Sequence, residues 1–263
     1  MATHRGVLVL ALVALAARTA GAIVTVTACE AIVPDHEVGV LAADLTCTAD
    51  APSVILANRA TLDLNGHTLT HTSTEPTVRC EGSRCAVLSS VPGGTIVTAA
   101  TAVRGNRVTV SDCAVDVTGS GGDVVNAFRV TAENLRITNA TSAALMGLKI
   151  SATNVELVDC WIGVFALTRF RGELVTVTGG GTGIIAPRRA SVSGLTIHGT
   201  GYEGVRARGI RLVDSDVTGN GTLGSGVDLA TERRPILVSS VCGVSRVLTD
   251  PPSTDTWGVC QND

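Results

Sequence analysis

Positively charged side chains recur at a fixed spacing in the middle of the sequence. They are Arg129, Lys149, Arg169 and Arg189, at steps of 20 residues, together with Arg171 and Arg211 two places further along the same repeat. Arginine binds carboxylate and sulfate groups through two parallel hydrogen bonds, so such a row predicts a surface for a polyanion. The alternative is a solvated face whose charges are relieved by Glu133, Glu173 or counterions.

The residues between these cations explain why they should share one face. The apolar residues Val110, Val130, Ile150, Phe170, Ala190 and Ile210 repeat at the same step. Alternate side chains of a strand point to opposite sides, so an inward apolar column places its neighbours outward. The six cations would then span five coils, or roughly 20 Å. Stacked like charges repel, so a chain that tolerates them can use them to hold carboxylate or sulfate groups.

The same repeat predicts the elements that position the cations. Apolar residues also stand at Val97, Val117, Ile137, Leu157, Val177, Ile197, Val217 and Leu237, and turn-forming residues at Gly119, Asn139, Asp159, Gly179, Gly199 and Gly219. Within each unit the apolar period is two, which is typical of strands. We therefore predict an all-β parallel helix of about 8–9 coils, with three short strands per coil of about 20 residues. Asn134 and Asn154 fall in one column, where amide side chains can hydrogen-bond along the stack.

Composition agrees with a narrow coil. The chain has 263 residues, of which 45% are apolar, 2% aromatic and 16% charged, and it contains 29 Gly. This content argues against disorder and against a core built from aromatic residues. Residues 124–211 carry 10 basic and 5 acidic groups, although the whole chain has a net charge of −3. A basic middle between acidic ends indicates an anionic partner.

The ends of the chain and its cysteines indicate an exported protein. Residues 1–22 have the pattern of a signal peptide, and a lipoprotein anchored at Cys29 is the lesser alternative. The even number of cysteines predicts disulfides, and the pairs expected are Cys29 with Cys47, Cys80 with Cys85, and Cys242 with Cys260. Cys113 and Cys160 are expected as small buried apolar residues. We predict an N-terminal cap over 23–50, the coil over 51–237 with a loop leaving it at 71–94, and a C-terminal cap over 238–263.

Three segments resemble a known group of proteins. They are Thr61-Leu62-Asp63-Leu64-Asn65-Gly66-His67-Thr68-Leu69, Ala43-Asp44-Leu45-Thr46-Cys47 and Trp257-Gly258-Val259-Cys260. They are similar to secreted bacterial members of the right-handed parallel β-helix proteins, the pectin-lyase-like superfold, in a subgroup without assigned activity. The resemblance implies a groove for acidic polysaccharides along the stacked strands. The Asn-x-Asp, Asp-Asp, Gly-His-Gly and Arg-x-Lys motifs of its hydrolases are absent, so no catalytic residue is carried over.

These features predict a secreted β-helix that binds an acidic polysaccharide or forms part of a cell surface. The alternative is a lyase that acts on a uronic-acid polymer, with an Arg or Lys of the row as its base. Trp161 and Tyr202 lie near matching turns, where they either contact sugar rings or cap the coil edge. We expect no cofactor, no metal site, no nucleic-acid partner and no membrane span.

Overall fold

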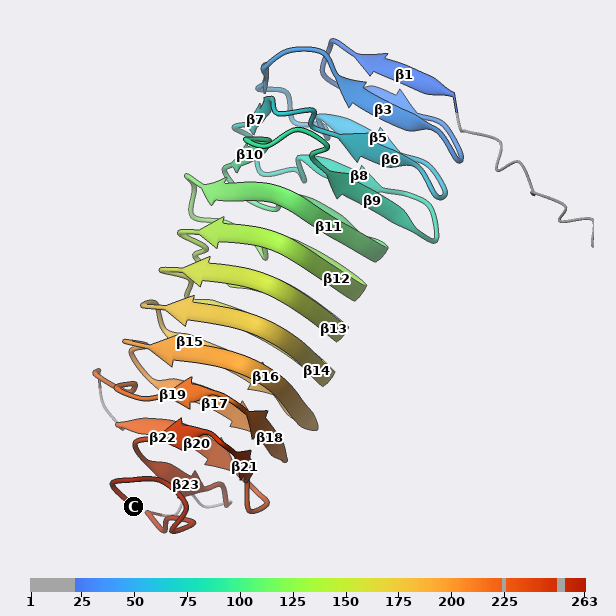
Figure 1. Ribbon diagram of the computed structural model, residues 1–263. Helices are drawn as coiled ribbons and strands as arrows, with labels where there is room; N and C mark the ends of the chain where they lie inside the picture. Colours follow the sequence, from blue (N-terminus) through green and yellow to red (C-terminus); the bar gives the residue numbers. More distant parts are fainter. Residues whose placement is uncertain (1–21, 224–225, 250–253) are drawn as a thin grey trace, which may run out of the picture.

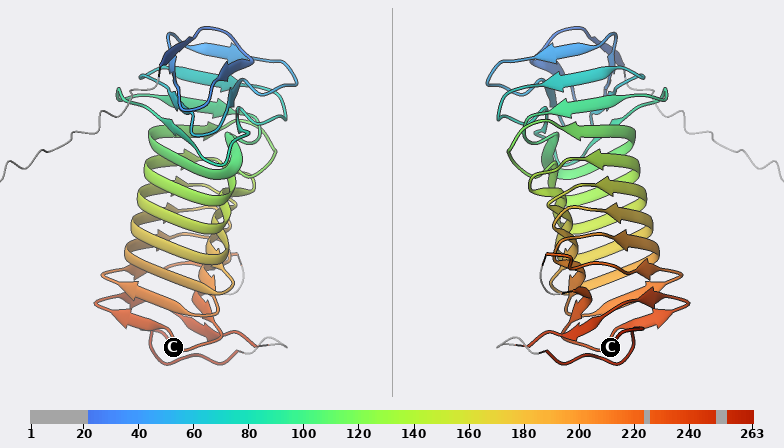
Figure 2. Two further views of the ribbon diagram at one scale, coloured as in Figure 1. Left: turned by 90° about the vertical axis from the view of Figure 1, so that its right-hand side faces the viewer. Right: turned by 90° about the vertical axis from the view of Figure 1, so that its left-hand side faces the viewer.

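The protein folds as one long parallel β-solenoid. The computed structural model describes residues 22–223, 226–249 and 254–263, and over these residues the chain makes about 11 turns without a helix. Figures 1 and 2 show the turns stacked into a column, with the N-terminal strands at one end and the C-terminal strands at the other. The all-β fold predicted from the sequence is confirmed, with more turns than the 8–9 expected. The described residues include no helix long and apolar enough to cross a membrane.

The N-terminal coils are built from short strands. β1 pairs in parallel with β3, β3 with β6 and β6 with β9, while β2, β5 and β8 form a second stack and β4, β7 and β10 a third. The strands are β1 (Ile23–Val26), β2 (Ala31–Val33), β3 (Val38–Leu41), β4 (Leu45–Cys47), β5 (Val54–Leu56), β6 (Thr61–Asp63), β7 (Thr68–His71), β8 (Val78–Cys80), β9 (Cys85–Leu88) and β10 (Thr95–Thr98).

Two predictions about this region need correction. Residues 23–50, predicted as a cap, already form coil, because β1 to β4 pair in parallel with the next turns. Residues 71–94 were predicted to leave the coil as a loop, yet they contain β8 and β9, which pair with the first long strand, β11 (Val103–Val117). The number of residues along the sequence between paired positions varies here, as the pairs Ile23 with Val38 and Val54 with Val78 show. A count at a fixed period therefore misses these coils.

The central coils contain the long strands. β12, β13, β14 and β16 follow β11 in register, and Val130, Ile150, Phe170, Ala190 and Ile210 stack in one column as predicted. The bounds are β12 (Val125–Thr138), β13 (Ala143–Val158), β14 (Ile162–Thr178), β15 (Thr182–Ala186) and β16 (Arg189–His198). These five apolar side chains are at most 3% exposed. Burying a side chain of this kind stabilises the fold by roughly 1.5–3 kcal/mol, so the column forms the core beneath the exposed cations.

The 20-residue step does not continue into the flanking coils. Val108, not Val110, pairs with Val130, because the turn between β11 and β12 is longer. Toward the C-terminus Arg211 pairs with Ile236, and Leu237 consequently stacks on Leu212 rather than on Val217. The outer members of the predicted columns are therefore wrong, while the members from Val130 to Ile210 and from Ile137 to Val217 are confirmed.

A column of bends separates two faces of the coil. Asp112, Asn134, Asn154, Leu174 and Asp214 occupy this bend with backbone φ between 47° and 55°. Asp and Asn tolerate this left-handed conformation better than other non-glycine residues. The Nδ2 of Asn154 donates to Oδ1 of Asn134 at 2.8 Å, and the Nδ2 of Asn134 donates to Oδ1 of Asp112 at 2.7 Å. The predicted stacking of amides is thus confirmed.

The C-terminal coils end beneath a crossing segment. Trp257 in this segment donates its indole N–H to the carbonyl of Thr231, and the only isolated bridge among the described residues joins Arg246 to Thr256 in antiparallel sense. The strands here are β17 (Glu203–Ala207), β18 (Ile210–Val213), β19 (Asp216–Val217), β20 (Val227–Thr231), β21 (Ile236–Val238), β22 (Val241–Cys242) and β23 (Ser245–Val247).

The cysteines pair as predicted. Disulfides join Cys29 with Cys47, Cys80 with Cys85 and Cys242 with Cys260. Cys113 and Cys160 are free and buried in the core. Burial raises the pKa of the Cys113 thiol to about 12 and that of Cys160 to about 11, which leaves both thiols protonated and inert at neutral pH. Three disulfides indicate an oxidising environment such as the cell exterior.

Candidate functional site: a cationic face on the solenoid

Four predicted cations form an unbroken column on the central coils. Arg129 pairs with Lys149, Lys149 with Arg169, and Arg169 with Arg189, each on the neighbouring strand. All four side chains are exposed, and each precedes a buried apolar residue. Strands in a sheet lie about 4.8 Å apart, so the column presents positive charge at that step along the solenoid axis.

The other two predicted cations lie in a parallel column two residues further on. There Thr131 pairs with Ser151, Ser151 with Arg171, Arg171 with Ser191 and Ser191 with Arg211. A shallow hollow of about 230 Å³ lies between the two columns; its lining includes Arg129, Lys149, Arg169 and Arg171. We call the exposed surface formed by both columns the cationic face.

The sequence analysis missed one member of this face. Arg107 of β11 pairs with Arg129, so the first column has five consecutive cations. Arg107 stands 22 residues before Arg129 and is therefore skipped by a 20-residue count. A signal was present, because Arg107-Val108 has the same order of cation and apolar residue as Arg129-Val130.

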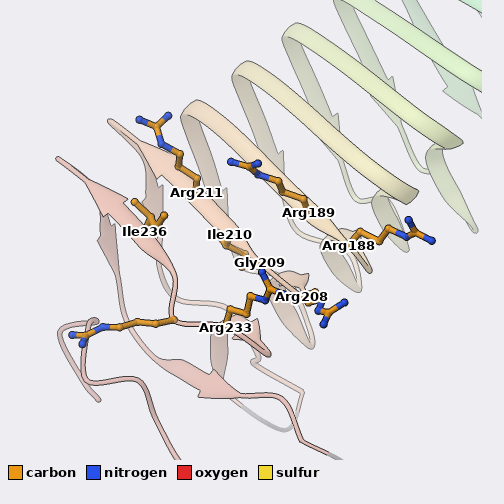
Figure 3. Close-up of a pocket in the computed structure, with 9 residues that line it drawn as sticks. Arg188, Arg189, Arg208, Gly209, Ile210, Arg211, Arg233 and Ile236 are labelled. Atoms are coloured by element: carbon orange, nitrogen blue, oxygen red, sulfur yellow. The ribbon is translucent and has the colours of Figure 1, made fainter.

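A second group of arginines closes the C-terminal end of the face. A pocket of about 590 Å³ opens there, and Figure 3 shows arginines from neighbouring coils around Gly209 and Ile210. Arg189 and Arg211 belong to the predicted set, whereas Arg188, Arg208, Arg233 and Arg234 were not predicted. Arg233 and Arg234 escape a 20-residue count because their coil follows a step of 25 residues, seen in Arg211 with Ile236. Arg188 and Arg208 stand 20 residues apart, so the same count could have found them.

Acidic side chains do not neutralise the cationic face. Over the described residues, only one arginine of the pocket has an ion pair, between Nε of Arg208 and Oε2 of Glu232 at 3.1 Å. Neither Glu133 nor Glu173 forms an ion pair with any cation in the described ranges. The two glutamates considered as a source of relief are thus not paired with the row.

The two predicted aromatic residues lie elsewhere. The rings of Trp161 and Tyr202 contact each other edge to face, with centroids 5.7 Å apart and planes at 80°. Trp161 lies in the turn between β13 and β14, whereas Lys149 and Arg169 lie midway along those strands. Both rings are partly exposed, at 50% and 42%. The structure therefore brings the aromatic residues to each other but not to the cationic face.

Neither a metal centre nor a relative supplies further chemistry. No group of three or more His, Cys, Asp or Glu side chains that could hold a metal ion occurs within the described ranges. Comparison of the chain with protein-family models, with curated proteins and with solved structures finds no significant match.

Proposed function

We propose that the protein binds an acidic polysaccharide along the cationic face. The observation that supports this most directly is the column of five stacked cations, which have no ion-pair partner among the described residues: Arg107, Arg129, Lys149, Arg169 and Arg189. Stacked like charges destabilise a sheet, and an external polyanion would relieve that repulsion.

The shape of the face favours a polymer over a single small anion. Exposed charge contacts contribute only about 0.2–1 kcal/mol each, so one cation holds one carboxylate weakly. The five cations of one column can act together on a polysaccharide that carries charges at a regular spacing. Because the contacts are linked through one polymer, its affinity can far exceed that of a single contact. The polymer would run parallel to the solenoid axis, because the cations repeat in that direction.

Export is part of the proposal. The disulfides indicate an oxidising environment, and the predicted signal peptide at 1–22 would deliver the chain there. Residues 1–21 of that segment lie outside the described residues, so its test is separate: N-terminal sequencing of the exported protein should begin near Ile23.

The binding test compares charge-matched variants. Pectate, alginate and sulfated glycosaminoglycan are titrated into the wild-type protein, into R129A/R169A and into R104A/R136A, at about 0.05 M and about 0.5 M salt. Both variants lose two exposed arginines, but Arg104 and Arg136 lie outside the cationic face. We expect weaker binding only for R129A/R169A, with affinity falling as salt rises. Equal binding by both variants, or no binding by the wild type at low salt, would exclude the proposal.

The same samples distinguish binding from cleavage. A lyase acting on a uronic-acid polymer leaves an unsaturated product that absorbs in the ultraviolet. We expect no increase in absorbance on prolonged incubation. An increase abolished in R129A/R169A would replace the binding role with the lyase alternative.

A further inference from the structure

Gly209 interrupts the cation column at one point. The amide of Ala190 donates to the carbonyl of Gly209 at 3.0 Å, so the residue beside Gly209 on the preceding coil is Arg189. On the following coil the amide of Arg233 donates to the carbonyl of Arg208 at 3.0 Å, which places Arg233 beside Gly209. Gly209 is therefore a gap between two arginines of one column.

Neither backbone conformation nor crowding requires glycine at this position. Gly209 is not among the residues with positive φ, and a Cβ added there would meet no atom within 4 Å. Most glycines of the coil differ: Gly180, for example, has a φ of 75° and leaves 1.9 Å between such a Cβ and the carbonyl oxygen of Cys160. The missing side chain at Gly209 has one evident consequence, which is open space in the pocket of about 590 Å³.

Six arginines line that space. Arg188 and Arg189 come from one coil, Arg208 and Arg211 from the next, and Arg233 and Arg234 from the third. Only Arg208 has a carboxylate partner, Glu232, within the described part of the chain. In Figure 3 the guanidinium groups of Arg188 and Arg211 point away from each other, as repulsion between like charges predicts.

We infer that this pocket is a binding site for a tetrahedral oxyanion, either a sulfate or a phosphate group, seated over Gly209. A carboxylate has two oxygens, which one guanidinium fork can satisfy. A tetrahedral anion has more oxygens directed away from one another, so it can accept hydrogen bonds from arginines on different sides of the pocket. The site goes beyond the proposed function, because it selects a chemical group rather than a polymer.

The test uses the free ions first. Sodium sulfate, phosphate and acetate are titrated into the full-length protein at constant ionic strength by calorimetry. We expect sulfate or phosphate to bind at least about tenfold more tightly than acetate. G209L fills the space and R211A/R234A removes two donors, and each should weaken sulfate binding by at least about tenfold. T178L places the same side chain at an exposed position away from the cationic face, at the end of β14, and should bind sulfate like the wild type.

A second arm separates a free ion from an ester carried by a sugar. A sulfated hexasaccharide and its desulfated form are compared on the same variants. Tighter binding of the sulfated form that is lost in G209L assigns an ester as ligand, whereas response to free sulfate alone assigns an ion. The inference fails if acetate matches sulfate and phosphate, or if G209L and R211A/R234A both bind like the wild type. Pectate binding retained by G209L would show that the cationic face acts independently of the pocket.

Discussion

Asn154 donates its side-chain amide to Oδ1 of Asn134 at 2.8 Å, in the bend where each long strand changes direction. The next residue in that column is Leu174, which has a φ of 53° and is 59% exposed. Leucine offers no side-chain hydrogen bond and is disfavoured in the left-handed region by about 1–2 kcal/mol. The amide ladder therefore stops at a strained position.

Replacing Leu174 by Asn should stabilise the protein. The variant would relieve backbone strain and allow a hydrogen bond to Asn154, for a gain of about 1 kcal/mol in the free energy of unfolding. Chemical denaturation measures this gain. L174A is the matched control, because it keeps a Cβ in the same backbone conformation without an amide; equal stability of L174N and L174A would contradict the expectation.

Truncating Phe170 should be the more costly of two similar changes. Phe170 is fully buried, and Phe170→Ala should lower the free energy of unfolding by about 3–5 kcal/mol through lost apolar burial and a cavity. Phe128 is 54% exposed, so Phe128→Ala removes the same atoms at a cost of less than about 1 kcal/mol. Denaturant midpoints of the two variants compare the effects directly, and similar losses would show that Phe170 does not anchor the core.

Arg107→Ala should weaken binding of acidic glycans about as much as Arg129→Ala, because the two side chains are adjacent members of one column. Each loss should be a few-fold, as for one exposed charge contact of about 0.2–1 kcal/mol. Arg104→Ala serves as the control, since Arg104 is exposed on the same strand but outside the cationic face. An equal loss of glycan affinity in Arg104→Ala and Arg107→Ala would indicate that the glycan is attracted by the overall charge of the protein rather than by the column.

Trp161→Ala should lower stability without changing glycan affinity. The edge-to-face contact with Tyr202 contributes about 0.5–1.5 kcal/mol, which a double-mutant cycle with Tyr202→Phe and Tyr202→Ala can measure. Glycan affinity should stay at the wild-type value because the pair lies away from the cationic face. A marked loss of affinity would move the binding surface to the turn edge.

Stability should depend on the ionisation of Asp263. Desolvation raises the pKa of this carboxyl, but hydrogen bonds from the Ser245 side chain and from the backbone amides of Cys260, Ser245 and Val259 outweigh it, so the pKa is lowered. A lowered folded-state pKa gives stability that is present above the unfolded pKa of about 4 and lost as pH falls through the folded value. Asp263→Asn should thus lower the Tm at pH 7, and the difference from wild type should shrink below pH of about 4.

A matched substitution checks the origin of that effect. Asp50 is exposed and has no side-chain hydrogen bond or ion pair within the described residues, so Asp50→Asn should leave the Tm unchanged at every pH. A pH-independent loss of Tm in Asp263→Asn would point to packing rather than to the charge.

The sequence by itself determined the class of fold, the disulfide pairs and which side chains of the central strands point into the core. Alternation along a strand is a local property, so the order Arg129-Val130-Thr131 was enough to place Val130 inside and its neighbours outside. The constant step between Val130, Ile150 and Phe170 then implied stacking in parallel.

Only the tertiary structure decided which coils lie beside one another at the ends of the repeat. The turns there differ in length, and the register between coils depends on how each turn packs rather than on a constant count of residues. For this reason Val108, and not the predicted Val110, stacks on Val130, and Arg107 belongs to the cation column. For the same reason β8 and β9 are part of the coil. The arginine pocket over Gly209 and the contact of Trp161 with Tyr202 arise in the same way. Each joins residues from different coils, and the packing of the turns decides which of these residues lie side by side.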